Sequence, residues 1–299
     1  MIIGGKREQV IENIRQAAES GAFHCKVEVD DPVLTAEEGQ DLLRRYLEKR
    51  ATLGFRVNNR IARWAANTAS KKINADTEIL GLENVIGIAG GAILTSNHFN
   101  PVDNTALRML ALAAGRKKLC IASNESNFAM SGWIGYLMNY ADTFPVSMRQ
   151  SYIAEHFESL LWNLLKEKNF ILIYPEQEMW FNYRKPRPPK RGAYYYAAKF
   201  GVPVISCFVE IRDLEELDAP SFHKVRYVLH VLPPIFPDPA KNARENSLVM
   251  CERDHLQKKA AYEAAYGKPL DYRFEPDDIA GWIPPAERKN PMISGRLQN

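Results

Sequence analysis

The sequence predicts an α/β fold in which helices flank a mixed, largely parallel sheet, with a helical N-terminal region and a C-terminal helix. Between residues 76 and 235, short apolar segments typical of strands alternate with segments of helical periodicity. The chain has 299 residues, of which 46% are hydrophobic and 25% charged. This composition is typical of a globular protein that can bury a core, and it excludes disordered and collagen-like classes.

Residues 1–75 are expected to be helical. Val10, Ile14 and Ala17 recur at helical spacing. Thr35, with a glutamate three residues later, forms a capping box that opens a second helix. A third helix has an apolar face from Leu53 to Thr68, including Trp64, and arginines lie along one flank of this face.

Residues 76–235 are expected to form the α/β core. The predicted strands cover residues 78–82, 92–96, 118–122, 142–146, 170–174, 203–209 and 225–231. Helical patterns separate most of them, notably at residues 153–168 and 192–200. Residues 236–299 begin with a Pro-rich segment, continue with a helix at about residues 247–266, and end in an irregular tail.

Composition excludes several functional classes. The formal net charge is only +3, which argues against a nucleic-acid partner. The four cysteines are scattered without a CxxC pair, so we expect free thiols in the core and no zinc site. No apolar run approaches the roughly 20 residues of a membrane-spanning helix, and the start is too polar for a secretory signal. A cytoplasmic protein, soluble or peripheral on a membrane, is expected.

Common catalytic motifs are missing from the sequence. There is no GxSxG elbow, no GxxxxGK[ST] phosphate loop, no GxGxxG and no HExxH. Serine-hydrolase, nucleotide-hydrolase, Rossmann and zincin interpretations therefore lose their main support.

A histidine and an aspartate five residues apart follow one of the apolar strands. His98 lies on the predicted strand-to-helix connection, and Asp103 falls in the first turn of a helix that Asn100 and Pro101 are expected to open. An ionised aspartate beside the imidazole would fix its tautomer, which suits a general base. A capping aspartate beside an ordinary loop histidine is the alternative interpretation.

Two further charged residues follow apolar strands. Arg149 comes just after the strand at 142–146, and Glu176 just after the strand at 170–174. In a parallel sheet these strand ends share one edge with His98, where ligands bind in α/β proteins. The loop 184–191 holds five basic residues, among them Arg184 and Lys185, and can hold a phosphate or form a solvated basic loop.

Four blocks of the sequence resemble the glycerolipid acyltransferases, the family of the lysophosphatidate (1-acylglycerol-3-phosphate) acyltransferases. Asn97-His98-x4-Asp103 is similar to the HxxxxD block, 144–149 to the block ending in arginine, 174–178 to the F-P-E-G-T block, and 201–208 to the fourth block. Gln177 and Glu178 stand where the family usually has Gly and Thr, and Ser206 where it usually has proline.

The resemblance implies an O-acyltransferase that moves a fatty acyl group from a thioester to the hydroxyl of a lysophospholipid, most simply 1-acylglycerol-3-phosphate to give phosphatidate. His98 would be the base and Asp103 would hold it. Arg149 and the block with Glu176 and Gln177 would bind the glycerol-phosphate end. The donor would be acyl-CoA or acyl carrier protein, with no metal and no bound cofactor.

The basic loop with Arg184 and Lys185 is expected to contribute to the same phosphate site. A long-chain substrate favours a reaction at the bilayer surface. Transfer of the lipid into water would cost roughly 0.8 kcal/mol for each of about 15 methylenes. The helix from Leu53 to Thr68 suits contact with the inner face of the cell membrane, unless its apolar face packs on the protein's own core.

Two other functions remain open at this stage. The acceptor could be a glycolipid or a small alcohol. Alternatively, the chain could be a lipid-binding protein with a degenerate acyltransferase fold, which the changes at Gln177, Glu178 and Ser206 motivate.

Overall fold

The computed structural model describes residues 5–29, 32, 34–147, 149 and 152–288. Its centre is a seven-stranded sheet of strand order β1-β7-β6-β2-β5-β3-β4. The strands are β1 (Glu78–Leu80), β2 (Ala92–Thr95), β3 (Leu119–Asn124), β4 (Thr143–Val146), β5 (Phe170–Leu172), β6 (Val204–Ala219) and β7 (Phe222–Val231).

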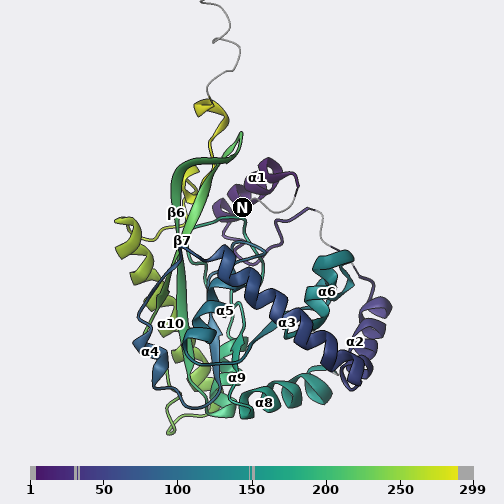
Figure 1. Ribbon diagram of the computed structural model, residues 1–299. Coiled ribbons are helices and arrows are strands. Elements are labelled where there is room, and N and C mark those ends of the chain that lie inside the picture. Colours follow the sequence, from purple (N-terminus) through teal and green to yellow (C-terminus); the bar gives the residue numbers. More distant parts are fainter. Residues whose placement is uncertain (1–4, 30–31, 33, 148, 150–151, 289–299) are drawn as a thin grey trace, which may run out of the picture.

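Most of the sheet is parallel. β6, β2, β5, β3 and β4 run in one direction, and only β7 with its parallel neighbour β1 runs in the other. β6 rises through the molecule in Figure 1, so the carboxyl ends of these five strands lie toward the top. The predicted fold class, a mixed and largely parallel sheet flanked by helices, is confirmed.

Helices cover both faces of the sheet (Figure 1). The α-helices are α1 (Arg7–Glu19), α2 (Ala36–Arg50), α3 (Leu53–Ile73), α4 (Glu83–Ile86), α5 (Asn104–Ala113), α6 (Gly132–Tyr140), α8 (Glu158–Lys166), α9 (Gly192–Phe200) and α10 (Ala243–Tyr266). Short turns of other helix types complete them: η1 (Glu125–Ala129), the π-helical η2 (Ile153–Phe157), η3 (Pro276–Asp278) and η4 (Pro285–Glu287).

Alternate strand residues feed two separate cores. On one face Ile93 and Ile171 pack with side chains of α2, α8, α9 and α10. On the other face Leu94 and Leu172 pack with side chains of α4 and α5. Because these strands are buried on both faces, their sequences are continuously apolar, and these apolar runs are what predicted the strands.

Some predicted boundaries differ from the structure. β6 continues to Ala219, ten residues beyond the predicted end, because it pairs with β7 in a long hairpin. The outer residues of β6 are exposed and mostly charged, so they lack the apolar pattern of a buried strand. α10 starts at Ala243 because Asn242 and Glu245 form a capping box. Cys25 is exposed, whereas Cys120, Cys207 and Cys251 are buried as expected.

The first 75 residues hold α1, α2 and α3. α1 packs with Trp180, Phe181 and the segment 279–282 in a small core of its own. Within the described residues, no helix combines the length and the apolar composition that a membrane crossing requires.

A buried carboxylate fastens α10 to the sheet. Asp254 accepts hydrogen bonds from Thr95 at the end of β2 (2.6 Å), from Tyr194 of α9 (2.5 Å) and from Lys258 of α10 (2.6 Å). Burial by itself would raise the pKa of Asp254, but the Lys258 ammonium and the three hydrogen bonds together lower it. The carboxylate is therefore ionised in the core and depends on Lys258 for compensation.

Replacement of Lys258 with methionine should destabilise the fold strongly. The change leaves the Asp254 charge buried without its cation, so we expect a loss of about 3–5 kcal/mol in the free energy of unfolding at pH 7. A lowered folded-state pKa contributes stability above the unfolded value of about 3.9 and loses it as pH falls. The difference between wild type and Lys258→Met, measured by urea unfolding, should therefore shrink as the pH falls below about 4.

Lys259 is the matched control on the same helix. Its ammonium is exposed and lies 3.9 Å from Glu263, so Lys259→Met should change stability by about 0.5 kcal/mol or less. Equal effects of the two substitutions would contradict the role assigned to Lys258.

Candidate active site

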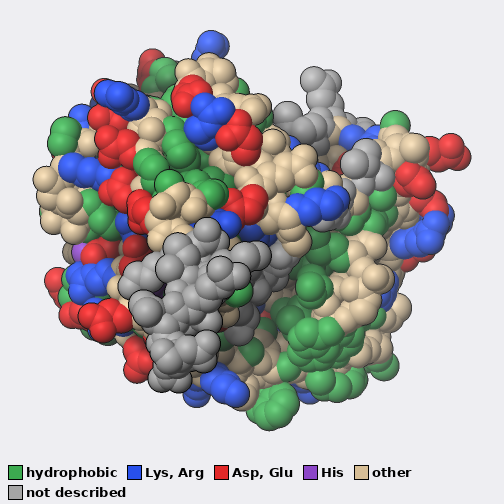
Figure 2. Space-filling model, turned by 90° about the horizontal axis from the view of Figure 1, so that it is seen from above, with side chains coloured by type: hydrophobic (Ala, Val, Ile, Leu, Met, Phe, Trp, Pro, Cys, Tyr) green, Lys and Arg blue, Asp and Glu red, His purple; other side chains and the backbone are tan. Residues whose placement is uncertain are grey.

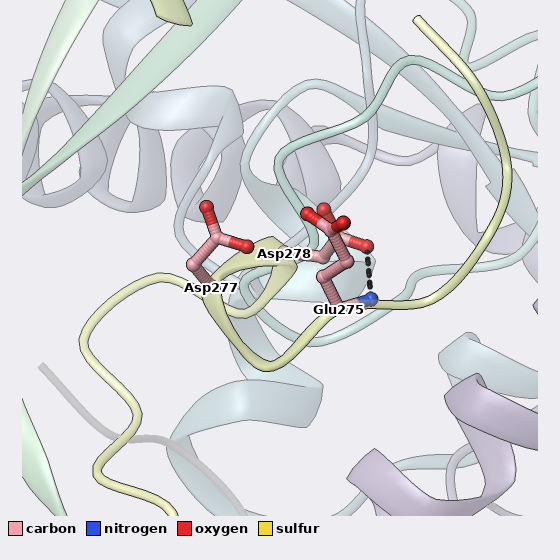
Figure 3. A group of neighbouring side chains, drawn as sticks. All are labelled: Glu275, Asp277 and Asp278. Atoms are coloured by element: carbon pink, nitrogen blue, oxygen red, sulfur yellow. Dashed lines mark hydrogen bonds between the residues drawn. The ribbon is translucent and has the colours of Figure 1, made fainter. Parts of the chain in front are cut away.

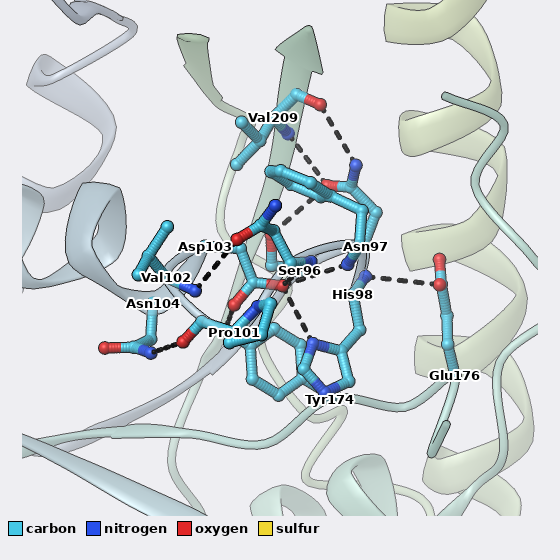
Figure 4. Close-up of polar contacts among 12 residues, drawn as sticks. Ser96, Asn97, His98, Pro101, Val102, Asp103, Asn104, Tyr174, Glu176 and Val209 are labelled. Atoms are coloured by element: carbon cyan, nitrogen blue, oxygen red, sulfur yellow. Dashed lines mark hydrogen bonds and ion pairs between the residues drawn. The ribbon is translucent and has the colours of Figure 1, made fainter. Parts of the chain in front are cut away.

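The loop that follows β2 is fixed to the neighbouring strand β6. The buried side chain of Asn97 donates to the carbonyl oxygen of Val209 (3.0 Å) and accepts from the Val209 amide (2.8 Å). This pair of bonds mimics a strand pairing after β2 has ended. It fixes the backbone position of the next residue, His98, relative to the end of β6 (Figure 4).

His98 and Asp103 meet across this loop, as the sequence predicted. The Nδ1 atom of His98 lies 2.8 Å from Oδ2 of Asp103, whose side chain is only 2% exposed. A carboxylate acceptor requires Nδ1 to carry the proton, which leaves Nε2 as the basic nitrogen. The His98 side chain is 21% exposed, so the ring is held from one side and open to solvent in part.

Asp103 is held by the loop that it organises. The backbone amides of Phe99 and Asn100 donate to its Oδ2 at 2.9 and 3.3 Å. The predicted helix start at Pro101 is wrong, because α5 begins at Asn104 and Asp103 occupies the N-cap position. The carboxylate makes no capping bond to α5 and turns back toward His98 instead.

Tyr174 completes the surroundings of the pair. Its hydroxyl donates to Oδ1 of Asp103 (2.5 Å), and its ring stacks on the His98 ring with centroids 3.9 Å apart (Figure 4). Burial and the nearby Asp103 charge raise the pKa of Tyr174 well above its usual value. The phenol therefore stays protonated and remains a hydrogen-bond donor.

Glu176 lies beside His98, but its carboxylate is engaged within the protein. Its Oε1 accepts from the Arg187 amide (2.9 Å), and its Oε2 accepts from the His98 amide (3.2 Å) and from Nε of Arg187 (3.0 Å). Both side chains of this ion pair are almost completely buried. The predicted contact of Glu176 with substrate stays a prediction.

Arg149 lies at the same edge of the sheet, farther from His98. It follows β4, three strands away from β2, which corresponds to about 14 Å at the usual strand spacing. Its Nη2 lies 3.4 Å from Oε1 of Glu125, and a Cβ atom at Gly39 of α2 would approach the guanidinium to 2.6 Å. The absence of a side chain at Gly39 therefore provides the space for the contact between Arg149 and Glu125.

The basic loop binds acidic groups of the protein itself. Arg184 pairs with Asp213 (2.5 Å), and the buried ammonium of Lys185 pairs with Asp278 (2.8 Å). Gln177 is exposed and has a φ of 69°, a conformation that explains the glycine usual at this position of the family block. The substrate contacts predicted for these three residues stay predictions.

Three carboxylates lie close together at η3, opposite the basic loop. Glu275, Asp277 and Asp278 bring one oxygen each within 4.8 Å of one another (Figure 3). The ammonium of Lys268 lies 2.9 Å from Asp277, 3.3 Å from Glu275 and 3.7 Å from Asp278. Lys185 also lies 2.8 Å from Asp278. Two ammonium groups of the protein thus already pair with these carboxylates, which therefore form an internal ion-pair cluster.

Two residues of the site, Tyr174 and Arg187, are not predicted as functional by the sequence. Tyr174 falls at the end of the predicted strand 170–174, and Arg187 falls within the basic loop 184–191. The only available signal was their proximity to Glu176 in sequence, since nothing local shows that Tyr174 reaches Asp103 or that Arg187 turns inward.

Comparison with known proteins places residues 76–210 in a known family. A family model described as Acyltransferase matches residues 76–210, the segment that carries all four sequence blocks. The crystal structure of the 1-acyl-sn-glycerophosphate (LPA) acyltransferase PlsC from Thermotoga maritima is similar, with 14% identity, 89% of this chain and 99% of that chain covered, and a TM-score of 0.47. No curated protein matches the chain.

The family match contains the histidine–aspartate pair and the strands that position it, β2 and β5. It confirms the resemblance drawn from the sequence blocks. The chain therefore carries an acyltransferase domain at residues 76–210.

Proposed function

We propose that this protein is an O-acyltransferase that acylates the free hydroxyl of a lysophospholipid, most specifically 1-acylglycerol-3-phosphate to give phosphatidate. The observation that carries the proposal is the His98–Asp103 pair, 2.8 Å apart at the carboxyl end of a parallel strand within an acyltransferase domain. The donor is an acyl thioester of coenzyme A or of acyl carrier protein.

The reaction needs one base. Nε2 of His98 removes the proton of the acceptor hydroxyl while that oxygen attacks the thioester carbonyl carbon. The C–S bond then breaks, and the imidazolium returns the proton to the departing thiolate. Asp103 stabilises the imidazolium, and such general-base assistance typically contributes about 10²–10⁴-fold in rate. No covalent intermediate with the protein is required.

Arg149 is the residue that we assign to the phosphate of the acceptor. Arg149 follows β4 at the carboxyl edge of the sheet, its side chain is 28% exposed, and Glu125 is its protein partner. A distance of about 14 Å between β2 and β4 suits an acceptor that lies along the edge. A glycolipid or a small alcohol as acceptor would not need this cation.

A membrane partner is supported by an exposed apolar surface, called here the apolar patch. Leu53, Val57, Ile61 and Trp64 form one stripe along α3 and are 75%, 56%, 52% and 69% exposed, and they do not pack on the core. The neighbouring α6, which contacts α3 through Tyr136 and Asn58, adds exposed Trp133 and Ile134.

The candidate site lies at the carboxyl edge of the parallel strands, in the loops that follow β2 and β5. Figure 2 shows the molecule from above, onto the edge where the parallel strands end, and hydrophobic side chains gather at its lower right over the region of α3 and α6. Arg56 and Arg60 are exposed on α3, while Arg63 is tied to Asp142 (2.6 Å). Docking on the inner face of the cell membrane through this patch would bring a lipid acceptor to the site without transfer into water.

Loss of the base should abolish acyl transfer. His98→Ala is expected to lower kcat by about 100-fold or more with an unchanged circular dichroism spectrum, because no other group would take the hydroxyl proton. The measurement is thiol release from acyl-CoA and from acyl carrier protein with lysophosphatidate, a lysoglycolipid or a small alcohol as acceptor. His156→Ala, at an exposed histidine, should keep wild-type rates.

The acceptor panel also separates the alternatives. Turnover only with acceptors that lack phosphate would favour the glycolipid or alcohol function. Lipid binding without turnover by the wild type would favour a non-catalytic protein. A His98→Ala variant with nearly full activity would refute the assignment of the base.

Removal of the Tyr174 hydroxyl should weaken catalysis without abolishing it. Tyr174→Phe keeps the ring on His98 but deletes a hydrogen bond to a charged group, worth about 1.5–3 kcal/mol. We expect kcat to fall roughly 10-fold, since about 1.4 kcal/mol corresponds to a factor of ten, with KM values unchanged. Steady-state kinetics check this, and an unchanged kcat would show that Asp103 does not need the phenol.

The apolar patch should control binding to vesicles. Burial of a large apolar side chain is worth about 1.5–3 kcal/mol and an arginine near an anionic surface about 1 kcal/mol. Trp64→Ser combined with Arg60→Ser should therefore weaken binding to anionic liposomes by roughly 100-fold in sedimentation assays. Leu256→Ser, at a 54% exposed leucine of α10, is the control, and an equal loss there would contradict a specific membrane face.

A further inference from the structure

A buried ion pair encloses the peptide groups on both sides of His98. The side chains of Glu176 and Arg187 are 3% and 1% exposed. Oε2 of Glu176 accepts the His98 N–H at 3.2 Å. The His98 carbonyl oxygen in turn accepts from the Trp180 amide at 3.1 Å and from Nη2 of Arg187 at 3.4 Å. The donor and the acceptor of this one residue are thus held by the loop that follows β5.

Every nitrogen of the Arg187 guanidinium has a partner within the protein. Nε donates to Glu176 at 3.0 Å, Nη1 to the Phe23 carbonyl oxygen at 2.7 Å, and Nη2 to the carbonyl oxygens of Glu178 and His98. The guanidinium also lies over the Trp180 ring, 4.5 Å from its centroid. Both charged groups are buried and bonded within the protein, so neither is available to bind a substrate.

The ring and the backbone of His98 are therefore fixed by different groups. Asp103 and Tyr174 hold the imidazole, whereas Glu176 and Arg187 hold the peptide units from which it projects. A base must lie within hydrogen-bond reach of the proton that it removes, and a displacement of about 1 Å can lower a rate about 100-fold. A tilt of the His98 backbone moves Nε2 even when Nδ1 stays on Asp103.

We propose that Glu176 and Arg187 are positioning residues for His98, acting through its backbone and not through contact with the acceptor. The inference rests on the proposed function of His98 as the base. It also gives the segment before the acyltransferase domain a role, since the Phe23 carbonyl oxygen completes the coordination of Arg187 and His24 lies 3.4 Å from the Glu176 carbonyl oxygen.

The test uses Glu176→Gln, which keeps the shape of the side chain, and Arg187→Lys, which keeps the charge but loses the fork of donors. Both are assayed as full-length protein with acyl-CoA and lysophosphatidate in mixed vesicles. We expect kcat to fall 10- to 100-fold while KM for either substrate stays within twofold. A substrate contact would instead raise the KM of the acceptor, and that result, or an unchanged kcat, would overturn the inference.

A spectroscopic readout separates positioning from general destabilisation. Protein labelled with ¹⁵N-histidine gives ring signals, and the one that disappears in His98→Ala belongs to His98. That signal should shift or broaden in both positioning variants. The control is Arg116→Met, which removes an arginine bound to the carbonyl oxygens of Ile88 and Lys168, before β2 and β5, and should leave the His98 signal and kcat unchanged.

The two readouts also distinguish failure of this inference from failure of the proposed function. If His98→Ala keeps its activity while the His98 signal moves in Glu176→Gln, the base assignment is wrong and the positioning of His98 is right. An unmoved signal in the folded Glu176→Gln protein would overturn the positioning role by itself. Should Arg187→Lys fail to fold, the Glu176→Gln result decides alone.

Discussion

The site depends on one carboxylate, that of Asp103, and on the number of donors that converge on it. The His98 ring, the Phe99 and Asn100 amides and the Tyr174 hydroxyl all donate to its two oxygens. A buried carboxylate is stable only when it is paired and hydrogen-bonded. The same donors that satisfy Asp103 therefore fold the loop around it, and this loop presents the imidazole at the end of β2.

Buried ionic groups recur around this loop and join distant parts of the chain. Asp254 connects α10 to the end of β2, and the Glu176–Arg187 pair connects the loop after β5 to both His98 and the segment at Phe23. Replacement of such pairs by apolar residues often leaves stability unchanged or higher, so their geometric specificity is the better explanation for them. Residues outside 76–210, in α10 and near Phe23, thus make buried contacts with the acyltransferase domain.

The outer surface of α3 is apolar along one stripe. The stripe on α3 leaves large apolar side chains in solvent, an arrangement that a monomeric soluble protein rarely tolerates over a contiguous area. Hydrophobic side chains gather over the region of α3 and α6 on the face seen in Figure 2, the end toward which β6 runs in Figure 1. A bilayer that contains the acceptor is the partner that we propose for this surface.

The fold class and the His98–Asp103 pair followed from the sequence alone, because both depend on local patterns: apolar strands of period and length typical of a buried sheet, and a histidine five residues before an aspartate across a turn. The predicted start of α5 was wrong, because the Asp103 side chain binds His98 and does not cap the helix. Tertiary structure alone decided the partners of Tyr174, Glu176 and Arg187, and it turned much of the basic loop inward. Those contacts join residues distant in sequence, and whether a charge faces solvent or a buried partner depends on burial that no local pattern records.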